Sequence, residues 1–228
     1  MFKMVFRLIL LGCLLSCKLS ETELSTDTNE GVFIISSSFR HPVTGKMVPY
    51  FPDDSVFCSG SSGIEKVTKT NQVIIEDKLA SSQDEPDTYF LIDFEKQYFA
   101  EVKDLQNISK AISINKPFSS PKKLGMEFNT TFYNKEPYTS VDTTIGGTKY
   151  TLIRYQSTLD EFKGANMSLY LTPMPKGSIT IFPRMEGFFK ARFARLEVTT
   201  LKGEEVNLQL TFQPGLSNYW KSIFKKLS

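Results

Sequence analysis

Two side chains could support thiol chemistry in this chain. Cys58 lies in a Ser- and Gly-rich segment, and His41 is the only histidine. A cysteine nucleophile needs a base that removes its proton, and His41 is the one imidazole that could do so. No known signature surrounds either residue. We therefore interpret Cys58 as a small, buried apolar side chain, and keep an enzyme that uses Cys58 as the alternative.

Acidic residues form three clusters that could bind a cation or act as an acid–base pair: Asp53-Asp54, Asp84-Glu85-Asp87 and Glu204-Glu205. Glycoside hydrolysis needs two carboxylates that converge on one bond, and calcium binding needs a loop with regularly spaced ligands. Each cluster lies in or beside a predicted turn, where solvated acids are expected. A usual zinc site cannot be built from one His and one free Cys. We predict no metal, no cofactor and no enzymatic activity, with a catalytic carboxylate pair as the alternative.

Residues 184–195 (RMEGFFKARFAR) interleave aromatic and basic side chains. Phe188, Lys190 and Arg192 could bind an anionic ligand by stacking and charge. The alternation of apolar residues at positions 189, 191 and 193 equally describes a strand with one face in the core. We favour the strand and retain the three residues as a candidate anion site. No Walker motif, dinucleotide-binding glycine motif or G-x-S-x-G elbow is present.

The first 16 residues have the pattern of an export signal. Lys3 and Arg7 precede an apolar run, residues 8–15, that is too short to span about 30 Å of hydrocarbon. The run ends in Leu14-Leu15-Ser16-Cys17, which resembles the lipobox of bacterial lipoproteins. The resemblance implies cleavage before Cys17 and acylation of its sulfur. Residues 17–31 would then be a lipidated cysteine followed by a flexible polar tether.

The charge balance excludes a typical nucleic-acid binder. The chain has 27 Lys and Arg against 25 Asp and Glu, and Lys3 and Arg7 of the signal account for the whole excess. A neutral exported chain lacks the basic footprint of such binders. Three sequons begin at Asn107, Asn129 and Asn166, and they would matter only for the remaining alternative, a secreted eukaryotic glycoprotein.

The elements that must position these residues are predicted to be β-strands. Short alternating runs are separated by turn residues, most clearly in the hairpin 138–155 around Gly146-Gly147 and in the strand 206–212. Residues 89–94 and 98–102 predict another hairpin, residues 81–87 a loop, and the pairs Leu169/Leu171 and Ile179/Ile181 two further strands.

Such spacing is typical of a mainly β protein built as a β-sandwich. We predict two tandem halves, residues 32–115 and 125–214, with a seam at 114–124, or one large sandwich. The segments 44–49 and 196–212 resemble parts of Ig-like or transthyretin-like modules, which implies the same architecture.

The C-terminal segment changes to a helical period. Trp220, Ile223, Phe224 and Leu227 form one apolar stripe within residues 216–228. We predict a short amphipathic helix that packs this stripe on the β body, with insertion into a membrane interface as the alternative. Taken together, these patterns predict a lipid-anchored protein of the bacterial envelope, in the outer membrane or at the cell surface. Its role would be structural or the binding of a protein or glycan.

Overall fold

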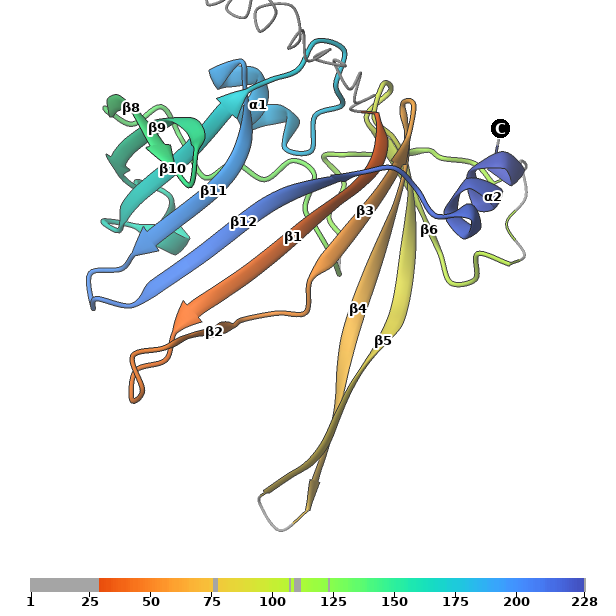
Figure 1. Ribbon diagram of the computed structural model, residues 1–228, viewed down its shortest axis with the longest axis horizontal. Helices are drawn as coiled ribbons and strands as arrows, with labels where there is room; N and C mark the ends of the chain where they lie inside the picture. The colour runs from red at the N-terminus through yellow and green to blue at the C-terminus, as the bar shows by residue number, and fades with distance from the viewer. Residues whose placement is uncertain (1–28, 76–77, 107, 109–111, 123, 228) are drawn as a thin grey trace, which may run out of the picture.

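The computed structural model describes residues 29–75, 78–106, 108, 112–122 and 124–227, with the backbone alone for residues 70–85. Twelve strands form one antiparallel sheet (Figure 1). The strands are β1 (Glu30–Arg40), β2 (Met47–Pro49), β3 (Asp54–Ser59), β4 (Ser62–Ile75), β5 (Lys78–Asp93), β6 (Tyr98–Val102), β7 (Lys116–Pro117), β8 (Thr139–Ile145), β9 (Thr148–Gln156), β10 (Asn166–Pro173), β11 (Ala191–Thr199) and β12 (Glu205–Pro214). The helices are the 3₁₀ turn η1 (Asp160–Phe162), α1 (Pro183–Phe189) and α2 (Asn218–Leu227).

The prediction of a mainly β protein is confirmed, but the predicted sandwich is wrong. The strand order is β7-β6-β5-β4-β3-β1-β12-β11-β10-β9-β8, with β2 added to β1. Strand β1 pairs with β12 from Gly31–Pro214 to Phe39–Val206 and so joins the strands of both predicted halves in one sheet. No second sheet is found among the described residues to form the other layer. The segments 44–49 and 196–212, which resemble parts of Ig-like modules, contribute β2, β11 and β12 to this same sheet.

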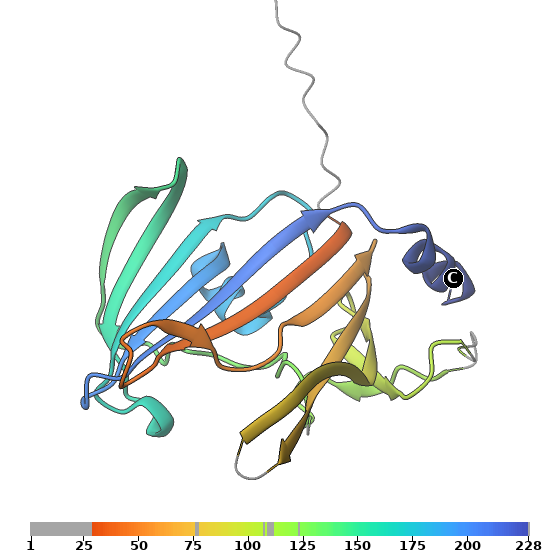
Figure 2. The same cartoon turned by 60° about the horizontal axis from the view of Figure 1, so that its bottom comes forward.

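A long connection takes the place of the second layer. Strands β7 and β8 follow each other in the chain but form opposite edges of the sheet. The chain from Phe118 to Tyr138, here called the crossing segment, must therefore run across one face of the sheet (Figure 2). Phe118, Met126, Phe128 and Tyr133 of this segment are buried. The predicted seam at residues 114–124 thus leads into a core-forming segment.

The sheet has a core on each face. The inner face, which we define as the one under the crossing segment and α1, carries the larger core, with Phe33, Ile92 and Phe193 among its strand residues. On the outer face a smaller core joins Ile64 and Leu91 to α2. The predicted C-terminal helix and its packing are confirmed: Ile223 and Phe224 are buried and Trp220 stacks on Phe57 with ring centroids 3.7 Å apart.

Local predictions have mixed outcomes. The Gly146-Gly147 hairpin is confirmed as β8–β9, and both glycines have positive φ. The hairpin before it is confirmed as the end of β5 and β6. The loop predicted at residues 81–87 is wrong, because these residues continue β5. The strand predicted at Ile179 and Ile181 is also wrong, since both side chains are buried in irregular structure.

The β4–β5 hairpin extends far beyond its neighbours. Strand β3 pairs with β4 only as far as Lys66, and β6 pairs with β5 only from Tyr89 onward. The residues beyond these points, Val67–Ile75 and Lys78–Thr88, pair only with each other. They form a two-stranded ribbon, here called the arm, that projects from the body of the sheet (Figures 1 and 2).

Candidate ligand-binding site

A hollow of about 460 Å³ opens beside the inner core where β9–β12 and β1 approach one another. Its volume lies within the range of about 300–1,000 Å³ typical of small-molecule sites. The surface is mainly apolar and includes one cation, Arg192, so we call it the Arg192 pocket. It is lined by Phe33, Thr148, Tyr150, Thr172, Pro173, Pro175, Arg192, Phe193, Ala194, Leu210, Thr211 and Phe212.

Arg192 is held rigidly at the wall of this pocket. The residue is 9% exposed, and its Nη2 donates hydrogen bonds to Ser178 Oγ at 2.9 Å and to the Ile179 carbonyl at 2.5 Å. The guanidinium carbon lies 4.9 Å from the centre of the Phe33 ring, a cation–π contact. Arg192 Nε is buried and lies 3.1 Å from Oε1 of Glu186, a residue of α1, in an ion pair that lacks the geometry of a hydrogen bond. The guanidinium is therefore a fixed positive charge beside an apolar surface.

Glu186, on α1, carries the negative charge that balances the charge of Arg192. Its Oε1 lies 3.1 Å from Arg192 Nε and accepts the Phe193 N–H, while Oε2 accepts the N–H groups of Ile181 and Phe182. Burial raises the pKa of Glu186, opposed by the Arg192 charge and these three N–H donors. Burial also lowers the pKa of Arg192, but a guanidinium starts so far above neutral pH that it stays charged.

The turn after α1 brings the two residues together. Pro183 occupies the first turn of the helix, where its missing N–H is harmless. The helix ends at Phe189, and the next residue, Lys190, adopts the left-handed conformation (φ 51°) and donates its N–H to the Glu186 carbonyl. The chain then reverses into β11, so that Arg192 returns over Glu186. Sequence alternation alone does not reveal this reversal.

The three residues of the sequence-derived anion site are therefore placed apart. Arg192 lines the pocket, whereas Lys190 is exposed at the end of α1 and Phe188 is 48% exposed. The Phe188 ring contacts Tyr133 and Phe189. The strand predicted from the alternation at residues 189, 191 and 193 is confirmed from Ala191 onward as β11, whereas Phe189 is the last residue of α1. The apolar partners of Arg192 come from β1 and β12, far away in sequence, and no local pattern points to them.

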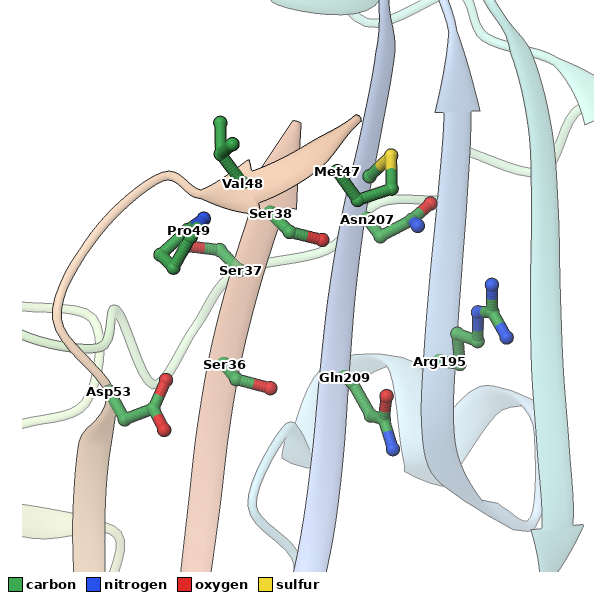
Figure 3. A pocket seen from close by; sticks show the side chains of 10 residues that line it. All are labelled: Ser36, Ser37, Ser38, Met47, Val48, Pro49, Asp53, Arg195, Asn207 and Gln209. Atoms are coloured by element: carbon green, nitrogen blue, oxygen red, sulfur yellow. The ribbon is translucent and has the colours of Figure 1, made fainter. Parts of the chain in front are cut away.

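A second hollow, of about 310 Å³, lies on the outer face of the sheet over β1, β12 and β11 (Figure 3). Ser36, Asn207 and Gln209 alternate with inward-facing residues and offer hydroxyl and amide groups. Arg195 lies at one side and forms an ion pair with Glu197 at 2.5 Å. This outer-face pocket is mainly polar, in contrast to the Arg192 pocket.

The structure does not bring Cys58 and His41 together. Cys58 faces Gly31 across the β1–β3 pair, while His41 follows the far end of β1. At about 3.3 Å per strand residue, roughly 30 Å separate them. The Cys58 side chain is fully buried, and burial raises the pKa of its thiol. His41 Nδ1 accepts N–H groups of its own turn, from Val43 and Thr44. Thiolate catalysis by this pair is therefore not supported.

In the described ranges, no three His, Cys, Asp or Glu side chains are grouped closely enough to hold a metal ion. The same part of the chain contains no helix that is both long and apolar enough to cross a membrane. Cys17 and the predicted export signal lie outside the described residues.

Comparison with known proteins does not identify a family. No family model matches the chain, and no curated protein matches it. Among solved structures, a LolA superfamily protein from Nitrosomonas europaea is similar at 8% identity and a TM-score of 0.25, covering 86% of this chain and 90% of the other. A domain named for outer membrane lipoprotein sorting, from Vibrio parahaemolyticus, is similar at 11% identity and a TM-score of 0.23, covering 86% and 91%. At these TM-scores the likeness carries no functional argument.

Proposed function

We propose that the protein is a non-catalytic binding protein of the bacterial envelope that holds an amphipathic anion in the Arg192 pocket. The observation that carries the proposal is a buried, rigidly held guanidinium at the wall of an apolar hollow. The apolar part of the ligand would lie among Phe33, Leu210 and Phe212, and its phosphate or carboxylate would accept hydrogen bonds from Arg192.

The chemistry of the pocket favours this class over small polar ligands. Burial of an alkyl chain contributes about 25 cal/mol per Å² of apolar area, and an ionised acceptor roughly doubles the strength of a hydrogen bond. Arg192 is already fixed by Ser178 and Ile179, so little of its conformational freedom is lost on binding. A free sugar or amino acid would leave much of the aromatic surface unused.

We further propose that the chain is exported and anchored through acylated Cys17. The support is the positive and short apolar stretch before Leu14-Leu15-Ser16-Cys17. Two or three acyl chains hold a protein firmly on a membrane, at about 0.8 kcal/mol per buried CH₂. Mass spectrometry of the membrane-extracted protein tests this. Acyl mass on a peptide that begins at Cys17, absent from a Cys17→Ala variant, supports the anchor, and an unmodified peptide refutes it.

A glycan is the second candidate ligand, at the outer-face pocket. The specific observation is the row of hydroxyl and amide groups from Ser36, Asn207 and Gln209, which can donate to and accept from the hydroxyls of a sugar. Loss of glycan-array binding in Gln209→Ala, with Thr172→Ala in the other pocket as control, would support this candidate.

Displacement of a fluorescent fatty acid tests the proposed ligand class. Ala194→Phe fills the Arg192 pocket and is expected to reduce binding at least tenfold. Arg195→Gln is the matched control, because it removes a neighbouring arginine that lines only the outer-face pocket. Equal binding by the wild type and Ala194→Phe would show that the fatty acid does not occupy this pocket.

A further inference from the structure

The two edges of the sheet differ in how they are protected. A free strand edge exposes unpaired backbone groups, and proteins usually shield it with Pro, Lys, bulges or a very short strand. One edge is β7, which has two residues, Lys116 and Pro117. The other edge is β8 (Thr139–Ile145), with seven residues, no Lys or Pro, and no irregularity in its pairing with β9. Val141 and Ile145 of β8 are 51% and 44% exposed.

The arm has the same asymmetry between its two strands. On the β5 side, Pro86 has no N–H group to offer, and two register shifts leave Asp87 and Ala80 without a paired residue on β4. On the β4 side, Val67–Ile75 pairs continuously and contains no Pro. Among the described strands, edge β8 and the arm part of β4 are therefore two long edges that contain no Pro and that no other strand covers.

The arm would also be stabilised by pairing with a third strand. An isolated two-stranded ribbon is marginally stable in water, whereas a third strand makes such a unit much more stable. In the described structure no other element pairs with the arm beyond Lys66 on β4 or before Tyr89 on β5. A third strand of about seven residues, such as β8, would match the length of the free β4 edge.

Charge distinguishes the possible pairings of these two edges. Asp142 is the only charged residue of β8 and its central one, so antiparallel pairing of two β8 strands in register would place Asp142 opposite itself. The free β4 edge, Val67–Ile75, carries Lys69 and no acid, so two β4 edges paired at this position would repel each other. Like charges across a strand pair are destabilising, whereas opposite charges stabilise it. Of these three pairings, only that of β8 with β4 combines Asp142 with Lys69.

We propose that β8 of one copy of this chain adds to the arm strand β4 of a second copy. The main-chain hydrogen bonds of the added strand provide the affinity, and the charges select the pairing. Lys69 already lies 3.6 Å from Asp87 within the arm, so Asp142 joins an existing charge network. Because the two edges differ, the contact is head-to-tail, and each copy keeps one free edge for the next copy.

Cross-linking of the full-length protein in membranes tests this inference. Thr68→Cys marks the β4 edge and Thr143→Cys marks β8, with the wild type as control for the native cysteines. With a short bismaleimide, the double variant is expected to form a series of multimers. The two single variants expressed together should form dimers, and each single variant alone should form none. Dimers from Thr143→Cys alone would show β8–β8 pairing and overturn the inference, as would the absence of cross-links in every variant.

Charge reversal gives an independent measurement. Asp142→Lys is expected to reduce the cross-linked fraction about threefold, in line with the small contribution of surface ion pairs. Lys69→Glu in the same chain should restore it. An Asp142→Lys variant that cross-links as well as the parent would overturn the assigned pairing. Circular dichroism of each variant checks that the sheet is intact.

Discussion

Glu186 and Arg192 form an ion pair within the inner core, with Arg192 Nε 3.1 Å from Glu186 Oε1 and Glu186 fully buried. The pair joins α1 to β11, and the carboxylate also accepts three backbone N–H groups around the turn. The ion pair thus fixes Arg192 at the wall of the pocket and also fixes the turn between α1 and β11. Its energetic role can be measured separately from ligand binding.

Glu186→Gln is expected to lower the free energy of unfolding by about 3–5 kcal/mol, because it leaves the Arg192 charge buried without a counter-charge. Urea denaturation measures the loss. The double variant Glu186→Gln/Arg192→Met should recover part of this loss, since it removes both charges and keeps an amide oxygen as acceptor for backbone N–H groups. A single Glu186→Gln variant within about 1 kcal/mol of the wild type would show that the pair is not coupled in this way.

A second buried ion pair, between Lys122 of the crossing segment and Glu65 of β4, links that segment to the sheet. Lys122 Nζ contacts Glu65 and donates to the Met126 carbonyl at 2.7 Å, and it lies 4.0 Å and 4.3 Å from the ring centres of Phe90 and Phe128. Burial raises the pKa of Glu65 and lowers that of Lys122, while each partner's charge opposes the shift.

Lys122→Met should therefore cost about 3–5 kcal/mol of stability and increase hydrogen exchange at the Met126 amide, which donates to Glu65 at 2.5 Å. The matched control is Lys116→Met, at an exposed lysine, for which no change beyond about 0.5 kcal/mol is expected. Unchanged exchange at Met126 in Lys122→Met would contradict the role of this pair.

Asp54 makes stability depend on pH near neutrality. Burial, with help from the Glu65 and Asp53 charges and against that of Lys122, raises the pKa of Asp54 to about 7. A carboxyl with a raised folded-state pKa is most stabilising below its unfolded pKa, and this contribution is lost as the pH rises to about 7. Asp54→Asn should flatten this loss and be more stable than the wild type at pH 8, by about 2 kcal/mol. Thermal unfolding of both proteins at pH 5 and pH 8 checks this prediction. An identical pH dependence of stability in the wild type and in Asp54→Asn would contradict it.

The docking of α2 should contribute a measurable share of the stability. Ile223 is 2% exposed in the outer core, so Ile223→Ala is expected to cost about 2–5 kcal/mol. Ile145, 44% exposed on β8, gives a matched control with the same substitution and a much smaller expected loss. Equal losses at both positions would mean that α2 is not an integral part of the core.

The sequence reveals local structure better than the arrangement of the strands. The alternation of apolar residues and the glycine turn are sufficient to predict the β8–β9 hairpin, and the helical period of apolar residues is sufficient to predict α2. The single open sheet depends on pairs such as Gly31 with Pro214, which are distant in the chain. The arm was missed because residues 81–87 have the composition of a loop, and pairing with β4 overrides that preference.

The candidate site was predicted only in part, for a similar reason. Arg192 was singled out by its aromatic neighbours in sequence, but alternation predicted a solvent-facing strand position for it. Its burial follows from the left-handed turn at Lys190 and from Glu186, a charge partner on the preceding helix. Phe33 and Phe212, whose rings lie 4.6 Å apart at the pocket, come from the two ends of the chain.

The most direct test of the central claim compares a ligand that has an anionic head group with one that has a neutral head group, in proteins with and without Arg192. Calorimetric titration of dodecyl phosphate and dodecanol is carried out with the wild type, Arg192→Gln and the outer-face control Arg195→Gln. We predict that Arg192→Gln weakens dodecyl phosphate binding at least tenfold, about 1.4 kcal/mol, and changes dodecanol binding little, while Arg195→Gln changes neither. Equal weakening of both ligands, or no saturable binding of dodecyl phosphate to the wild type, would contradict recognition of an anionic head group by Arg192.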